Sequence, residues 1–208
     1  YNKVARNKYI GKKPNAYGID KILFVCPECK KEHSLEVERD LIKCNHCGFS
    51  VRINEYYDLV DATKPSCPLD IDQWYKWQRR LVAKEIDSDG FEMTMNAKLC
   101  VLKTDKLRKS PKDRRVLSVG QAKLTKNGLS FKGLLDGKQV DFEFKPQNLY
   151  SLTCSTKGFL EFYYDNEYYM LIPDDACNTL IKWTLASEEI NTLYNAKWRQ
   201  ACEDVFEY

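Results

Sequence analysis

Four of the nine cysteines stand in two closely spaced pairs near the start of the chain, Cys26-Pro-Glu-Cys29 and Cys44-Asn-His-Cys47. Two intervening residues allow a tight turn to place both sulfurs of a pair on one metal ion, and two such turns complete a tetrahedron of thiolates around Zn²⁺. Gly48, directly after the second pair, suits such a turn. A redox-active dithiol or a disulfide is the alternative, but this spacing favours a metal. The sequence therefore predicts a zinc site formed by Cys26, Cys29, Cys44 and Cys47.

The predicted zinc is structural, because four thiolates fill the tetrahedral shell, whereas a catalytic zinc keeps one position open. His33 and His46 could each replace a cysteine as ligand, but with four thiols present we expect both to be surface residues. A segment of about 40 residues buries too little surface to fold alone, so that metal binding supplies folding free energy. The remaining cysteines are odd in number, which argues against a secreted disulfide framework and for a reducing, cytosolic setting in which they are small core residues: Cys67, Cys100, Cys154, Cys177 and Cys202.

A cluster of seven Lys and Arg side chains, with two acidic residues among them, lies between positions 103 and 115. It falls between two predicted strands, and a solvated loop is the simpler interpretation. In the sharper hypothesis the loop meets anionic lipid headgroups, where each Lys or Arg contributes about 1 kcal/mol to recruitment. The candidate lipid-binding residues are Lys103, Lys106, Arg108, Lys109, Lys112, Arg114 and Arg115.

Residues 70–86 are predicted to form a helix, because apolar side chains recur there at about the helical period. We expect its tryptophans, Trp74 and Trp77, to dock the helix between the zinc ribbon and the region that follows. A membrane-interface anchor is the alternative, since amphipathic aromatic side chains favour the depth of lipid headgroups.

The elements that position these residues divide the 208 residues into four stretches. Residues 1–21 are basic and broken by glycine and proline, which predicts an arm or linker. Residues 22–60 form the zinc ribbon, and residues 61–90 form a connector and the Trp-rich helix. Residues 91–208 form a strand-rich domain with C-terminal helices.

In the strand-rich domain, tight turns separate runs of alternating apolar and polar residues. Asn127-Gly128 and Asp136-Gly137 are typical of type I′ hairpin turns, and a third hairpin is expected at Asp165-Asn166. A helix is expected to begin near Asp174, and Ser187 is expected to cap a second one. The predicted strands are 98–103, 115–125, 129–135, 139–145, 149–154, 158–164 and 167–172.

Seven consecutive strands followed by a C-terminal amphipathic helix is the chain order of a pleckstrin-homology-like (PH-like) barrel. The predicted fold class is therefore α+β and mainly β, with a small zinc ribbon before a seven-stranded antiparallel PH-like barrel or sheet capped by C-terminal helices. A generic antiparallel sandwich is the competing architecture.

Composition excludes several functions. Hydrophobic residues make up 43% and charged residues 30%, an ordinary globular balance. No stretch approaches the roughly 18 uninterrupted apolar residues of a membrane span, and no signal-peptide core follows the basic start. Residues 22–66 hold six basic and eight acidic residues, the wrong sign for phosphate contacts, although residues 1–21 hold six basic and one acidic. No nucleophile–base pair, phosphate-binding glycine loop or carboxylate pair stands out, so no catalytic residue is predicted.

Several short motifs occur in one order along residues 22–185: Phe24-Val-Cys26-Pro-x-Cys29, Ile42-x-Cys44-x-x-Cys47-Gly48, Asn54-Glu55-Tyr56, Trp74-x-x-Trp77-Gln78, Gly158-Phe-Leu-Glu-Phe and Tyr168-Tyr169-Met. In these the chain resembles the C-terminal extension of Firmicutes lysophospholipid acyltransferases, the 1-acyl-glycerol-3-phosphate acyltransferase family. That family acylates the free hydroxyl of lysophosphatidate with an N-terminal catalytic domain, in which the histidine of a His-x4-Asp motif is the general base. This chain lacks the motif, since Glu38 stands five positions after His33 and Val51 five after His46.

The resemblance implies a non-catalytic accessory region, which serves membrane placement or regulation of a phospholipid-synthesising acyltransferase. Its partners would be the catalytic domain of the parent chain and an anionic membrane surface. Its expected location is the cytoplasm, including the cytoplasmic face of the membrane. A start at Tyr1 fits a piece of a longer protein, and a His-x4-Asp motif encoded upstream would identify the parent. The alternative is a zinc-ribbon interaction or nucleic-acid-binding module, and an enzyme in its own right comes third.

Overall fold

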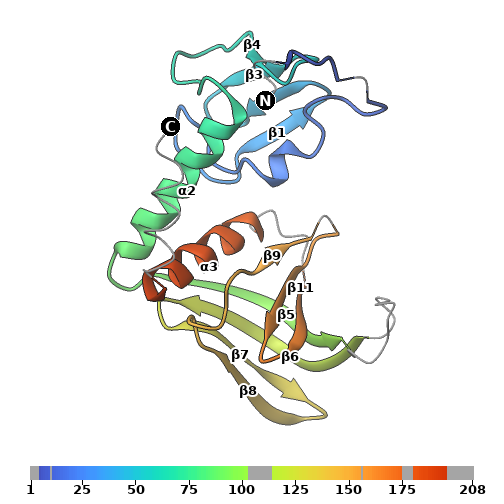
Figure 1. Cartoon of the computed structure of the whole chain (residues 1–208), viewed down its shortest axis with the longest axis vertical. Coiled ribbons are helices and arrows are strands. Elements are labelled where there is room, and N and C mark those ends of the chain that lie inside the picture. Colours follow the sequence, from blue (N-terminus) through green and yellow to red (C-terminus); the bar gives the residue numbers. More distant parts are fainter. Residues whose placement is uncertain (1–4, 10, 103–113, 156, 175–179, 196–208) are drawn as a thin grey trace. The chain divides into compact units, whose positions relative to one another are not determined.

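The computed structural model describes residues 5–9, 11–102, 114–155, 157–174 and 180–195 (Figure 1). The chain divides into two compact units, Tyr1–Leu81 and Val82–Tyr208. The boundary falls inside helix α2 (Ile71–Asp87), which therefore contributes its first turns to one unit and its last turns to the other. Among the described residues, no helix is both long and apolar enough to cross a membrane.

The first unit contains a small antiparallel sheet of four strands in the order β1-β2-β3-β4. Its buried side chains form one core together with the start of α2 and with Ala16, which precedes a single 3₁₀ turn, η1 (Ile19–Lys21). The strands are β1 (Leu35–Glu38), β2 (Leu41–Cys44), β3 (Ser50–Ile53) and β4 (Leu59–Val60).

The described part of the basic N-terminal arm contacts this sheet. Tyr9 N–H donates to the Glu55 carbonyl at 2.7 Å, and the Tyr9 ring meets Tyr57 edge-on at 5.2 Å. Arg6 forms an ion pair with Asp58 at 2.8 Å, and Lys8 forms one with Glu55 at 3.3 Å. Acidic residues of the ribbon therefore neutralise two of the arm's cations.

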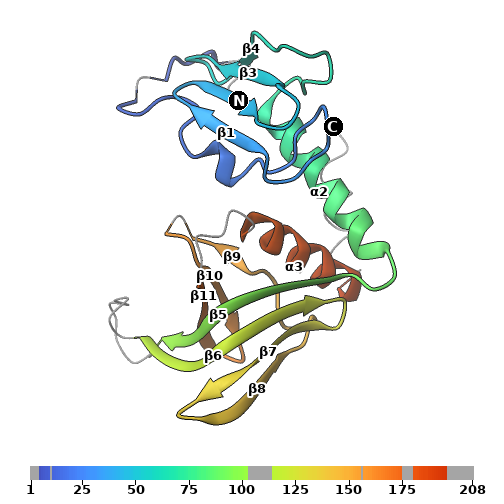
Figure 2. The same ribbon diagram turned by 180° about the vertical axis from the view of Figure 1, so that it is seen from behind.

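The second unit is a seven-stranded antiparallel sheet in the order β8-β7-β6-β5-β11-β10-β9. Figures 1 and 2 show it strongly curved, with helix α3 (Leu180–Tyr194) lying along its concave face. The core between them is apolar and includes Leu99, Phe131 and Trp183. The strands are β5 (Glu92–Leu102), β6 (Arg114–Thr125), β7 (Gly128–Leu135), β8 (Lys138–Phe144), β9 (Thr153–Cys154), β10 (Leu160–Tyr164) and β11 (Glu167–Pro173).

This architecture confirms the predicted fold class, mixed α+β and mostly β, with a small sheet before seven antiparallel strands and a helix. Closure into a barrel is wrong, because the edge strands β8 and β9 do not pair with each other in the described part of the chain. The segment that precedes β9 bonds to α3: Leu152 N–H donates to Ser187 Oγ at 2.8 Å, and Thr184 Oγ1 donates to the Leu152 carbonyl at 2.6 Å.

Ser187 therefore does not cap a second helix. It lies inside α3, which runs without a break from Leu180 to Tyr194. Its hydroxyl donates back to the Thr184 carbonyl at 2.9 Å and accepts from the Leu152 N–H. The serine therefore joins α3 to the segment before β9 and does not cap a helix.

The three predicted hairpins are present, but one turn differs. Asp136-Gly137 and Asp165-Asn166 have positive φ at both positions, as in type I′ turns. At Asn127-Gly128 only the glycine has a positive φ, and Thr125 pairs with Gly128. The turn residues are therefore Lys126 and Asn127, and Gly128 begins β7 in the manner of a glycine bulge.

Strands β6 and β7 approach unusually closely where Gly120 lies opposite Gly133. A Cβ on Gly120 would overlap the Lys132 carbonyl oxygen and Gly133 Cα, and one on Gly133 would overlap the Val119 carbonyl oxygen. The glycine pair is thus required by backbone packing at the bend of the sheet.

We predict that Gly120→Ala lowers the free energy of unfolding by about 1–3 kcal/mol, because the strands must separate to admit the methyl group. The matched control is Gln121→Ala at the adjacent exposed position, with an expected change within about 0.5 kcal/mol. Urea denaturation measures both, and equal effects of the two substitutions would contradict the close approach.

Candidate metal centre

The sulfur atoms of Cys26, Cys29, Cys44 and Cys47 gather at one point of the first unit, all within 4.8 Å of one another. Sγ of Cys26 lies 3.7 Å from Sγ of Cys47, and Sγ of Cys29 lies 3.8 Å from Sγ of Cys44. A tetrahedron with Zn–S bonds of about 2.3 Å has sulfur–sulfur edges of about 3.8 Å. The cluster therefore has the size of a Zn(Cys)₄ shell, and the distances are far too long for disulfide bonds of about 2 Å.

Both C-x2-C turns have the same backbone hydrogen bonds. Cys26 accepts from the N–H of Lys30 at 2.9 Å and donates to the Lys31 carbonyl at 3.1 Å. Cys44 accepts from the N–H of Gly48 at 3.1 Å and donates to the Phe49 carbonyl at 2.7 Å. The equivalent offsets, four and five residues on, mark a pair of zinc knuckles related by local pseudosymmetry.

The symmetry extends to positive backbone φ after the second cysteine of each turn. Gly48 has φ +72°, and Lys30, at the equivalent position of the first turn, has φ +60°. The sequence predicted the turn at Gly48 from its residue type. It gave no such signal at Lys30, because lysine has no preference for the left-handed region.

The electrostatic environment differs between the cysteines. Burial raises the pKa of the Cys26 thiol. For Cys44 burial acts in the same direction, but the Ser34 hydroxyl and the N–H groups of Cys47 and His46 favour the thiolate and together lower its pKa to about 6. Ser34 Oγ lies 3.2 Å from Cys44 Sγ and is buried. Of these two thiols, Cys44 is therefore the one that deprotonates at the lower cost.

The two histidines lie beside the cluster without joining it. The His33 ring stacks on Phe24, with centroids 5.6 Å apart, and the backbone N–H of His33 donates to the Phe24 carbonyl at 2.7 Å. His46 is exposed at the outer side of the second knuckle. The described four-cysteine cluster thus has a closed set of donors, which suits a structural zinc ion and leaves no protein-defined open position for catalysis.

Helix α2 is fixed to the segment that enters the first knuckle. Trp74 Nε1–H donates to the Val25 carbonyl at 2.9 Å. Gln78 accepts from the Phe24 N–H at 3.0 Å and donates to the Ile22 carbonyl at 2.7 Å. Trp74 and Gln78 are both fully buried. Two side chains one helical turn apart therefore satisfy three backbone groups that the sheet leaves unpaired.

The other predicted site residues are only partly described. Arg114 and Arg115 begin β6 and are exposed. Lys103, Lys106, Arg108, Lys109 and Lys112 lie outside the described residues. Trp77 packs partly buried against the core of the ribbon.

Ser34 and Gln78 are the site residues that sequence reasoning missed as individual contributors. Ser34 lies ten positions before Cys44, and nothing in its neighbours marks it as a thiolate partner. Gln78 had a signal, since a glutamine on the apolar face of a predicted helix requires a buried polar partner.

We predict that the purified chain contains about one zinc ion, and that removing the metal with a chelator exposes the amides of residues 20–60 to hydrogen exchange. Residues 114–173 should stay protected, because their sheet has its own core. Zinc loss should become easier as the pH falls, since protons compete with the metal for all four thiolates. Cys29→Ser should weaken zinc binding and His46→Ala should not; equal zinc content in both variants would contradict the ligand set.

The two knuckles provide a second prediction. Gly48→Ala places a side chain at φ +72° and should reduce the free energy of zinc binding by about 1 kcal/mol, because the alanine is strained in this conformation. Steric overlap is not the cause, since no atom lies within contact distance of the new methyl group. Lys30→Gly removes the backbone strain of a non-glycine residue at the equivalent position and should leave the zinc affinity unchanged or raise it. Competition with a chromophoric zinc chelator measures both, and a loss of affinity in Lys30→Gly would refute the pseudosymmetry.

Comparison with known proteins agrees with this geometry. Residues 20–53 match a zinc-ribbon family described as DNA directed RNA polymerase, 7 kDa subunit. No curated protein matches the chain. The matched segment contains all four clustered cysteines and both knuckles, so the first unit contains a zinc ribbon with a structural zinc site.

Proposed function

We propose that this chain is a non-catalytic accessory region of a phospholipid-synthesising acyltransferase that acylates lysophosphatidate, and that it serves placement of the enzyme at the membrane or its regulation. The zinc ribbon acts as a folding clamp, and the PH-like sheet carries the surface that meets the membrane. The acyl transfer itself belongs to the catalytic domain of the parent chain.

The main support is that the motifs of the resemblance pack together. Trp74 and Gln78 come from one motif, and their hydrogen bonds end on Phe24 and Val25 of the Cys26 motif. The Asn54 motif forms the turn before β4, where the Asn54 carboxamide accepts from the N–H groups of Tyr56 and Asp58 at 2.9 and 3.0 Å. Two motifs about fifty residues apart thus bond to each other, and a third forms a defined turn of the same unit, which favours a shared domain over a chance coincidence of short motifs.

Support for a membrane role comes from the surface of the second unit. The exposed side chains of Arg114 and Arg115 lie at the start of β6, next in sequence to the other five basic residues. Val119 and Leu134 face each other across β6 and β7 and are 45% and 57% exposed. Cations beside exposed aliphatic side chains favour an anionic lipid surface, which offers both phosphate charge and an apolar layer.

A zinc-ribbon interaction or nucleic-acid-binding module is the second candidate. The observation in its favour is the match of the ribbon to a family named for an RNA polymerase subunit. Against it, Arg6 and Lys8 of the basic arm pair with Asp58 and Glu55 of the ribbon and are partly neutralised. The first candidate therefore takes precedence.

We predict that the chain sediments with vesicles that contain anionic lipid and much less with neutral vesicles. Arg114→Glu with Arg115→Glu should reduce this binding by about tenfold or more, because each Lys or Arg near the surface contributes about 1 kcal/mol. The control is Lys138→Glu with Lys145→Glu, an equal change in net charge at exposed positions on β8 and after it. Equal binding to neutral vesicles, or equal losses in both variants, would overturn the membrane role.

Oligonucleotide binding at two salt concentrations tests the second candidate, since phosphate contacts weaken steeply with salt. Salt-sensitive oligonucleotide binding without vesicle binding would replace the first candidate by the second. The parent enzyme is tested separately by the residues encoded upstream of Tyr1, where we expect a catalytic domain with a His-x4-Asp motif.

A further inference from the structure

A pocket of about 430 Å³ opens on the convex face of the second unit, over strands β9–β11. Strand alternation defines its walls. Glu161 and Tyr163 point away from the core, whereas Leu160 and Phe162, which alternate with them along β10, are buried. The register places Tyr168 opposite Tyr163, so that β10 and β11 both contribute a tyrosine to the pocket. Its volume falls within the range of about 300–1,000 Å³ that small-molecule sites occupy.

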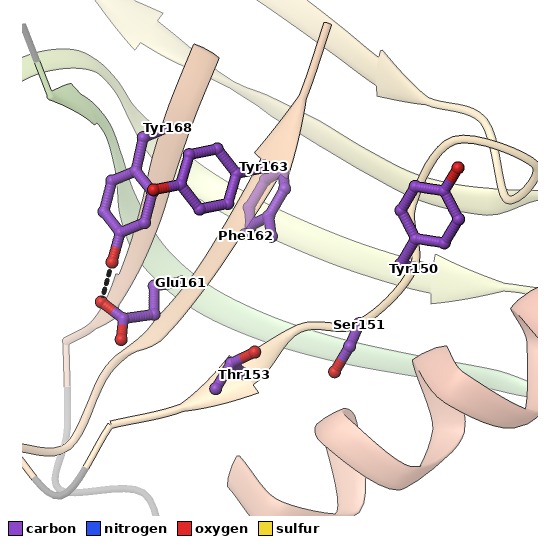
Figure 3. Close-up of a pocket in the computed structure, with 7 residues that line it drawn as sticks. All are labelled: Tyr150, Ser151, Thr153, Glu161, Phe162, Tyr163 and Tyr168. Atoms are coloured by element: carbon purple, nitrogen blue, oxygen red, sulfur yellow. Dashed lines mark hydrogen bonds between the residues drawn. The ribbon is translucent and has the colours of Figure 1, made fainter. Parts of the chain in front are cut away.

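Aromatic rings dominate this pocket. Figure 3 shows Tyr163 and Tyr168 together on one side and Tyr150 on the other, with Ser151 and Thr153 along the segment between. The rings of Tyr163 and Tyr168 meet at 66° with centroids 4.7 Å apart. Tyr150 is 71% exposed and Tyr163 is 57% exposed, so that both rings are accessible to a ligand.

The charge of the pocket is negative. The Glu161 carboxylate accepts a hydrogen bond from the Tyr168 hydroxyl. Burial and the neighbouring carboxylate raise the pKa of Tyr168, so that it remains a neutral phenol and a donor. Ser151 at the edge donates to a second carboxylate, Glu188, at 3.2 Å. No lysine or arginine is among the described residues that line the pocket.

From this combination we propose that the pocket binds a small organic cation of the trimethylammonium class. Tyrosine faces attract a cation within about 6 Å of the ring centroid, and the exposed rings of Tyr150 and Tyr163 offer such faces. Glu161 supplies the compensating charge. The combination of several tyrosines and one carboxylate is unfavourable for an anion.

Methylation is favoured over a bare ammonium group. A primary ammonium has three N–H donors that each lose a water partner on entry. In the pocket one oxygen of Glu161 already accepts from Tyr168, and the Ser151 hydroxyl already donates to Glu188. A trimethylammonium group has no donors to satisfy, and its methyl groups contact the rings directly.

The test is a titration of the full chain with choline, followed by NMR or calorimetry, beside 3,3-dimethylbutanol, which has the same shape without the charge. Choline should bind about tenfold or more tightly than the neutral analogue, because only the charged ligand gains the interaction with the rings and with Glu161. Equal affinity for the two compounds, or no binding of choline, would overturn the proposal.

Variants separate ring, charge and structural effects. Tyr163→Ala should weaken choline binding by about fivefold or more, whereas Tyr163→Phe keeps the ring face and should retain binding. Glu161→Gln should also weaken it, although the amide oxygen can still accept from Tyr168. The control is Tyr17→Ala, a tyrosine 61% exposed in the first unit, which should have no effect. An unchanged affinity in Tyr163→Ala would contradict the site.

Two further binding measurements, with phosphatidylcholine vesicles and with free choline, identify the source of the cation. Binding to neutral phosphatidylcholine vesicles as well as to free choline would indicate a lipid headgroup, and binding to free choline alone would indicate a soluble ligand. Either result supports the pocket. The proposal does not depend on the proposed function, because the titration with free choline and the Tyr163 and Glu161 variants decide it without any vesicle.

Discussion

The four thiolates on one metal ion are the constraint on which the first unit depends. They hold together the two knuckle turns, and thereby help to fix the segment Ile22–Val25 that enters the first turn. That segment offers backbone groups to Trp74 and Gln78 of α2. The packing of a helix that begins nearly fifty residues later thus depends on the geometry of the metal site.

Both helices use the same device to attach to their sheets. Buried polar side chains bind backbone groups of irregular segments: Gln78 of α2 binds Phe24 and Ile22, and Thr184 and Ser187 of α3 bind Leu152. Apolar packing alone would let a helix slide along a smooth sheet face, whereas such bonds are satisfied in one register only. The helices therefore owe their positions to a few polar contacts and their stability to the core.

Much of this could be predicted from sequence because the decisive signals are local. The two cysteine pairs need only short turns, and Asp136-Gly137 needs only its own φ preferences, so both were predicted correctly. The errors concern partners that lie far away in sequence. Ser187 has a capping residue type but bonds to Leu152, thirty-five residues earlier in the chain. Barrel closure likewise depends on the two edge strands, which no local pattern relates.

A cluster of charged residues in the sequence indicates a function only once the structure shows which of the charges form ion pairs within the chain. The arm appears basic, but Arg6 and Lys8 pair with acidic residues of the ribbon, so its charge is less available for phosphate than the composition implies. The start of β6 is different, since Arg114 and Arg115 are both exposed. On the same sheet Glu161 gives the tyrosine pocket the opposite sign. The second unit therefore presents basic side chains and a separate pocket with a carboxylate, so that its surface charge is mixed and not uniformly positive.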